Sequence, residues 1–106
     1  MYITDILEQV RLAADKRLLF LPHTIRQMSR PDRMITTKDV EEVIMTGEVI
    51  EDYPEDTRGH SCLILGCVMN SRYIHVMCAP KDEYLAIITT YLPNLIQWTP
   101  DFRERL

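Results

Sequence analysis

The feature that most constrains the fold is a run of three predicted strands in the second half of the chain. They cover Ser61–Val68, Tyr73–Ala79 and Tyr84–Leu92, and each is rich in β-branched and aromatic residues. Asn70-Ser71 fits a tight hairpin turn between the first two strands, and the polar linker Pro80–Glu83 joins the last two. Strands joined by such short connections predict an antiparallel meander.

The two hairpins predict which side chains face the core. Leu65 pairs with Val76, and Val76 with Ile87, if each hairpin is regular. These three residues are then expected to be buried against helices. His75 falls on the opposite, mixed face of the sheet, with Gly66 beside it. A bulge in either hairpin would exchange the faces.

Three helices are predicted before the strands. The first runs from Asp5 to about Asp15, with Thr4 or Asp5 as its N-cap. The second begins at Pro22, which suits a first helical turn, and ends near Ser29. The third begins with Thr36 and Asp39, which resemble a capping box.

The remaining segments complete an α+β fold. Gly47 ends the third helix, and Val49–Tyr53 is predicted as a fourth strand at the sheet edge. Pro93–Leu106 is predicted to form a C-terminal tail. This tail is either a short helix around Asp101–Arg105 or an extended arm. We therefore predict N-terminal helices packed on a four-stranded antiparallel meander, in a single domain over residues 1–106.

Composition narrows the classes of function. No apolar run approaches the roughly 20 residues that span a bilayer, and charged residues interrupt the N-terminal segment, so we expect a cytoplasmic protein without a membrane partner. The net charge of −4 argues against general nucleic-acid binding. Lys16–Arg33 nevertheless carries five bases against one acid, Asp32, and could meet phosphate locally.

The sequence carries no pattern for a metal or cofactor site. Its three cysteines, at positions 62, 67 and 78, form no Cys-x-x-Cys pair, and we expect reduced, buried thiols. Neither a glycine-rich phosphate loop nor a nucleophile elbow is present. We therefore expect no metal and no cofactor.

Several short motifs follow one another in a specific order. They are His23–Met28, Ile35-Thr36, Asp39–Val43, Gly47, Ile50–Pro54, Ser61–Gly66, Ile74–Val76, Ile87–Tyr91, Pro93, Trp98 and Asp101–Arg103. In this order the chain resembles the domain-of-unknown-function family 4258 from about Leu7 onward. Family members usually carry Arg four residues after the helix histidine, whereas this chain has Gln27.

This resemblance implies a fold and an activity. Family members are similar to RelE-type ribonuclease toxins of type II toxin–antitoxin systems, so a RelE/barnase-like fold and metal-independent RNA cleavage are implied. The implied partners are RNA and an antitoxin of the zinc-ribbon or helix-turn-helix type.

Metal-free RNA cleavage requires a base, an acid and cations that meet the phosphate. The catalytic candidates are His23 and His75 as base and acid, and Tyr91 as a group that stacks on a base or donates a hydrogen bond. The expected phosphate ligands are Arg26, Arg30 and Arg72.

Other interpretations of the same residues stay open. His23 also fits a surface position at a helix start, His75 a hydrogen-bonded histidine within a sheet, and Arg26 a solvated helix face. The chain would then be a non-catalytic protein-interaction module, or an inactive toxin-like domain, which Gln27 and the pI of about 5.3 would suit. We also expect a homodimer or an obligate partner, because several candidate surface residues are apolar: Tyr73, Met77, Ile88 and Trp98.

Overall fold

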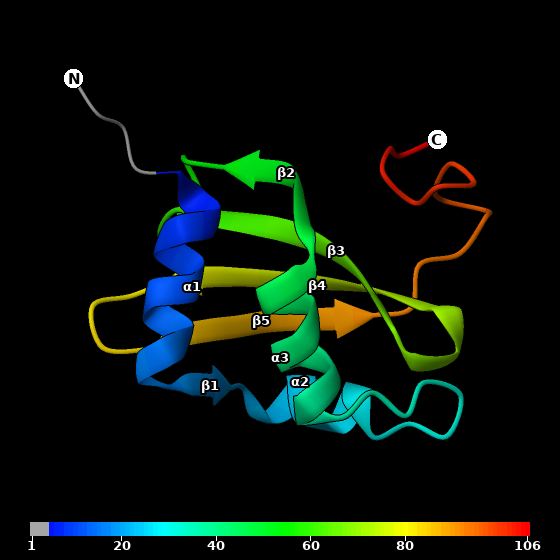
Figure 1. The fold of residues 1–106 in the computed structure, drawn as a ribbon, viewed down its shortest axis with the longest axis horizontal. Coiled ribbons are helices and arrows are strands. Elements are labelled where there is room, and N and C mark those ends of the chain that lie inside the picture. The colour runs from blue at the N-terminus through cyan, green and yellow to red at the C-terminus, as the bar shows by residue number, and fades with distance from the viewer. Residues whose placement is uncertain (1–4) are drawn as a thin grey trace.

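A five-stranded mixed sheet lies at the centre of the fold, and helices cover one of its faces (Figure 1). The computed structural model describes residues 5–106, apart from the side chain of Asn70. The strand order is β1-β5-β4-β3-β2. The strands are β1 (Leu18–Phe20), β2 (Glu48–Tyr53), β3 (Ser61–Val68), β4 (Arg72–Pro80) and β5 (Leu85–Tyr91). None of the helices among these residues is long and apolar enough to cross a membrane.

The helices agree closely with those predicted. They are α1 (Ile6–Lys16), α2 (Pro22–Met28) and α3 (Thr37–Thr46). Asp5 caps α1 by accepting a hydrogen bond from the backbone of Leu7, and Thr4 lies outside the described residues. The capping box of α3 is complete, because Thr36 and Asp39 each bond to the other's backbone N–H at 3.0 Å. Local capping and apolar spacing therefore determine these helices.

The prediction of a four-stranded, entirely antiparallel sheet was wrong at one edge. Leu18–Phe20 forms β1, which pairs in parallel with β5 through Leu18 and Leu85. The sequence signal was only a short apolar stretch before Pro22. Because a parallel pair joins segments far apart in the chain, no local turn signal announces it.

The predicted register between β3 and β4 was also wrong, by one residue. Leu65 lies opposite His75, and Ile64 opposite Val76. The cause is the connection, where the 3₁₀ turn η1 (Met69–Ser71), with Ser71 at φ 57°, replaces a two-residue turn. A shift of one residue exchanges the faces of a strand, so Leu65 is buried on the face away from the helices.

A bulge interrupts the pairing between β4 and β5. Cys78 lies opposite Ile87 and Met77 opposite Thr89, which leaves Ile88 as an extra residue in β5. Val76 therefore pairs with Thr90 and not with Ile87 as predicted. Beyond the bulge the faces of β5 exchange, and Tyr91 lies opposite His75.

The apolar core lies between the helices and one face of the sheet. Val76 and Ile87 are fully buried in it, as predicted, together with Ile64 in place of Leu65. The helices contribute Val10 from α1 and further residues from α3. Those α3 residues are Val40, Val43 and Ile44. Of the three free cysteines, Cys62 and Cys78 are buried, whereas Cys67 is exposed, contrary to our expectation.

The C-terminal tail, residues 93–106, turns back toward the sheet after β5 (Figure 1). It contains turns and an isolated bridge between Trp98 and Arg105, so of the two alternatives left open the short helix around Asp101–Arg105 does not form. Trp98 and Ile88 are only 2% and 7% exposed, so the surface predicted from them is occupied within the chain itself. Tyr73 remains 44% exposed.

The contact between α3 and β3 generates a stability prediction. Gly66 lies opposite Ile74, not beside His75, and a Cβ at this position would approach the Cα of Val43 to 2.9 Å. We expect Gly66→Ala to lower the free energy of unfolding by about 1–3 kcal/mol in urea titrations, because backbone atoms cannot move aside cheaply. Cys67→Ala, at the exposed neighbouring position, should change it by less than about 0.5 kcal/mol. Equal stabilities of Gly66→Ala and the parent chain would contradict the close approach.

Candidate functional site

His75 is the centre of a polar cluster on the sheet face away from the helices. The side chain is fully buried. Its Nδ1 lies 3.1 Å from the Tyr91 hydroxyl, and its Nε2 lies 2.9 Å from the backbone carbonyl oxygen of Phe102. The Trp98 ring meets the imidazole edge-on, with centroids 4.4 Å apart. His75 therefore contacts both its neighbouring strand and the tail.

The Phe102 carbonyl determines the tautomer of His75. A carbonyl oxygen only accepts hydrogen bonds, so Nε2 carries the proton and donates it. In a neutral imidazole Nδ1 then has a free lone pair and accepts from the Tyr91 hydroxyl. The oxygen of Tyr91 keeps its own lone pairs for another donor. Tyr91 is the less buried partner of this bond, because its side chain is half-buried while His75 is fully buried.

Burial sets the protonation of both partners. Desolvation lowers the pKa of His75 below its ordinary value, and the Phe102 carbonyl opposes this only in part. Desolvation likewise raises the pKa of Tyr91. Both side chains are therefore neutral near pH 7.

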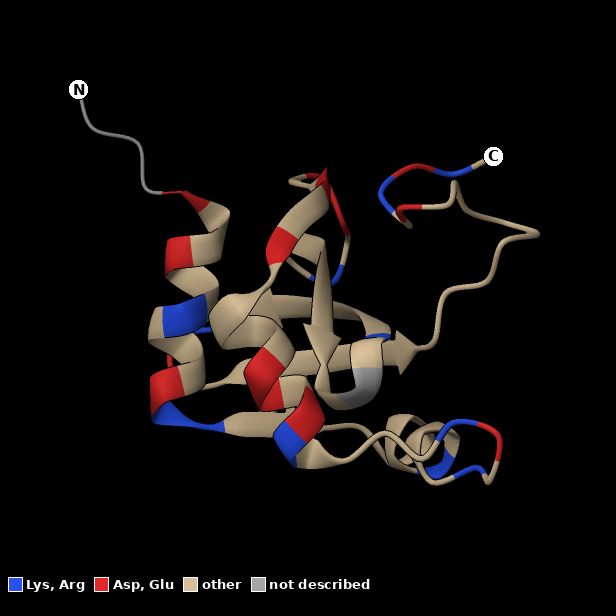
Figure 2. Cartoon of the chain, turned by 45° about the vertical axis from the view of Figure 1, so that its right-hand side comes forward, with Lys and Arg blue, Asp and Glu red and all other residues tan. Residues whose placement is uncertain are grey.

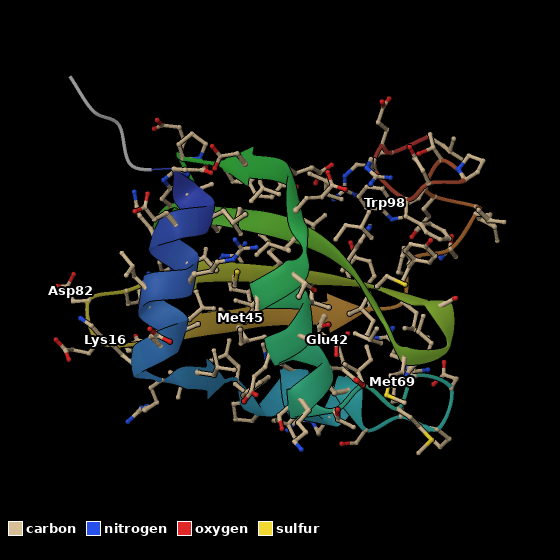
Figure 3. All side chains as sticks on the ribbon, in the orientation of Figure 1. Lys16, Glu42, Met45, Met69, Asp82 and Trp98 are labelled. Carbon is tan, nitrogen blue, oxygen red and sulfur yellow. The ribbon has the colours of Figure 1, made fainter. Side chains whose placement is uncertain are left out.

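Ion pairs hold the tail over this cluster. Arg105 binds Glu51 of β2 through two hydrogen bonds of 2.8 and 3.0 Å, and its guanidinium lies 4.6 Å from the centroid of the Trp98 ring. Arg103 pairs with Glu48 on the same strand. Figure 3 places Trp98 between the tail and the sheet. Two acids of the edge strand β2, Glu48 and Glu51, thus anchor the tail.

The second helix approaches the same sheet face from the edge of β5. The Thr24 hydroxyl donates to the carbonyl of Ile88, at the bulge, over 2.8 Å. Gln27 accepts a hydrogen bond from the Thr89 hydroxyl at 3.4 Å. Thr89 and Tyr91 share one face of β5. The α2 side chain that replaces the family arginine therefore lies beside the strand that carries Tyr91.

The structure unites two of the predicted catalytic residues and leaves the third apart. His75 and Tyr91 are hydrogen-bonded. His23 is exposed, one helical turn before Gln27 and on the same side of α2. No hydrogen bond or ring contact joins it to His75 among the described residues. The predicted action of the two histidines on one phosphate stays a prediction.

The three predicted phosphate ligands are not gathered around His75. Arg26 is exposed on α2, and Arg30 is paired with Asp32 at 3.4 Å. Arg72 donates to the backbone carbonyls of Arg33 and Met34. Along β4 it shares the helix-facing side with Ile74, opposite to His75. Their role in phosphate binding stays a prediction.

The sequence signals for this cluster were weak but present. Arg103 and Arg105 are two residues apart, as are side chains on one face of an extended segment, and Glu48 and Glu51 offer matching charge on β2. This complementarity could have indicated where the tail docks. The carbonyl of Phe102 had no such signal, because it belongs to the backbone. Over residues 5–106, no three His, Cys, Asp or Glu side chains are grouped so as to hold a metal ion.

The burial of His75 predicts how stability depends on pH. Its folded pKa lies below the ordinary value of about 6.5, so the unfolded chain binds the proton more readily. The His75 contribution to the free energy of unfolding should therefore be complete above about pH 6.5 and be lost as the pH falls toward the folded pKa. Histidine-resolved NMR titration should show His75 titrating below this value, and His23→Gln should leave its titration unchanged. A His75 that titrates at or above the ordinary value would contradict its burial.

Comparison with known proteins identifies the family over most of the chain. The sequence profile described as Domain of unknown function (DUF4258) matches residues 20–92, from the end of β1 to just beyond β5. The match is narrower than the resemblance described above, and it excludes α1 and the tail. No curated protein matches this chain significantly. No solved structure matches it either. Because the profile covers more than half of the sequence, the chain belongs to the DUF4258 family.

Proposed function

We propose that this chain is a toxin-like ribonuclease domain of the RelE type that cleaves RNA without a metal ion. The observation that carries the proposal is the pair formed by Tyr91 and the neutral His75 on the sheet face away from the helices. Tyr91 is half-buried, and its hydroxyl proton is directed to the buried imidazole of His75. The oxygen of Tyr91 can therefore accept a second proton from a substrate. Membership of DUF4258 is compatible with this function and does not specify it.

The proposed reaction uses Tyr91 and His75 as a proton relay. The ribose 2′-hydroxyl gives its proton to the Tyr91 oxygen, while Tyr91 passes its own proton to Nδ1 of His75. The 2′-oxygen then attacks the adjacent phosphorus, and the bond to the 5′-oxygen breaks. Because the imidazole is buried, His75 serves as the relay end and as a positioning residue, without touching RNA.

Residues of α2 supply the remaining roles in this proposal. His23 is exposed and acts as the acid that protonates the leaving 5′-oxygen. Arg26 lies on α2 and Arg30 in the turn that follows it, and both meet the flanking phosphates. Gln27 replaces the family arginine beside Thr89, so it offers an amide where a charge would otherwise contact phosphate. RNA binding by this chain therefore depends on few cations, and its affinity should fall only gently as the salt concentration rises.

A non-catalytic interaction module is the second candidate, and a specific observation favours it. His75 has no exposed surface, and both of its ring nitrogens are already hydrogen-bonded. The bond to Phe102 holds the tail to the sheet, the bond to Tyr91 joins β4 to β5, and neither needs a substrate to explain it. In that case the cluster is structural, and the chain acts through its surface on another protein, an antitoxin-type partner included.

Substitution of Tyr91 separates the two candidates. Tyr91→Phe removes only the hydroxyl, and we expect it to reduce cleavage of a labelled single-stranded RNA by about a hundredfold or more. His23→Ala should cause a loss of similar size, because its side chain is exposed and its removal leaves the core unchanged. Tyr73→Phe is the matched control, since Tyr73 is also on this face of the sheet and is 44% exposed.

Folding is monitored alongside activity. His75→Ala is not a clean test of catalysis, because loss of a buried ring and of two hydrogen bonds should itself destabilise the chain by roughly 2–4 kcal/mol. Full cleavage by Tyr91→Phe, or no cleavage by the parent chain under any tested salt concentration, would reject the ribonuclease proposal and leave the interaction module.

A further inference from the structure

A groove lies between α2 and the residues that lead into α3, away from the His75 cluster. We name it the Met34 groove. Ile25, Met28 and Ser29 line one side, and Met34, Ile35 and Thr36 the other. Its volume is about 440 Å³, within the range of small-molecule and side-chain pockets. The lining is mostly aliphatic and includes two methionines, which adapt to different occupants.

The Met34 side chain is held out into solvent by its backbone. Met34 has φ of 47°, in the left-handed region that side chains other than glycine rarely adopt, and it is 67% exposed. Neighbouring Ile25 is 40% exposed. A strained backbone that presents a large apolar side chain to water is a feature of binding sites more than of solvated loops.

Hydrogen bonds tie the loop that carries Met34 to α2 and to β4. Backbone N–H groups of Met34 and Ile35 donate to the carbonyls of Arg30 and Met28, each at 2.9 Å. Arg72 of β4 also donates to the carbonyls of Arg33 and Met34, and it pairs with Asp39 at 3.7 Å. The groove is therefore formed before any partner arrives, which reduces the entropy lost on binding.

Basic residues adjoin the lining residues of the groove in the sequence, on a chain that is acidic overall. From Arg26 to Lys38 the sequence has four bases and one acid, and Figure 2 shows them along α2, the loop that follows it and the start of α3. The acid, Asp32, is paired with Arg30. Arg26, Arg33 and Lys38 have no acidic partner among the described residues. An occupant that carries acidic groups is favoured.

We propose that the Met34 groove is a docking site for an acidic segment of a partner protein, which inserts an aliphatic side chain between Ile25 and Met34. The lining contains no aromatic ring, on which a single-stranded nucleic acid would stack. The proposal does not depend on ribonuclease activity.

The test uses synthetic fluorescent peptides and the full chain. One peptide has leucines at helical spacing with glutamates elsewhere; a second has lysines in place of the glutamates; a third has serines in place of the leucines. We expect the first to bind about tenfold more tightly than either of the others. Equal binding of the glutamate and lysine peptides would overturn the proposal.

Met34→Gly is the decisive variant. Glycine adopts a positive φ without strain, so this substitution should maintain or raise the melting temperature while it weakens binding of the acidic peptide by about tenfold. Met45→Ala is the matched control, because Met45 is 52% exposed on α3 outside the groove (Figure 3). Arg33→Glu should also weaken binding, whereas Arg17→Glu, a similar charge change outside the groove, should have little effect.

Two further outcomes would overturn the proposal in favour of other occupants. A uridine oligonucleotide that displaces the acidic peptide, and whose own binding Met34→Gly weakens, would indicate that RNA and not a peptide fills the groove. A dimer of the parent chain in sedimentation experiments that Met34→Gly dissociates would indicate that a second copy fills the groove.

Discussion

One extra residue in β5 determines how the two faces of the sheet are used. Before Ile88, the strand sends Leu85 and Ile87 into the helix-facing core; after it, Thr90 takes that side and Tyr91 turns to the other. Tyr91 is thereby brought to His75. At the same bulge, the carbonyl of Ile88 accepts a hydrogen bond from the Thr24 hydroxyl of α2. This bond holds α2 against β5 just beyond the last residue pair between β1 and β5. The bulge is therefore part of the site and not a local defect.

The tail covers the sheet face that the helices leave open. Helices cover one face, and Leu63, Leu65 and His75 are buried on the other, where a bare apolar surface would be costly. Trp98 supplies the cover, and the pairs from Arg103 and Arg105 to β2 fix its position. The guanidinium of Arg105 contacts both Glu51 and the Trp98 ring, so it links charge pairing with packing.

The parts of the fold that could be predicted were those with local causes. Capping residues and apolar spacing identified all three helices, and the composition of β2 to β5 identified these strands with bounds correct to about a residue. Register could not be predicted, because it depended on one additional residue in the turn after Val68 and one in β5. Each extra residue exchanges the sheet faces of the residues beyond it, without changing the amino-acid composition of the strand. The strand β1 was missed because its partner lies far along the chain.

The candidate site, like the fold, could be predicted only where its causes are local in the sequence. His75 was expected on the mixed face and does lie away from the helices, but its burial by residues 98–105 had no local signal. Its proton is positioned by a backbone carbonyl of the tail, and that tail lies outside the range 20–92 shared with the family. The tautomer and solvation of His75, which lies within the family range, thus depend on a segment outside that range. In such an arrangement, replacement of a short terminal peptide is enough to change the chemistry available to an unchanged domain.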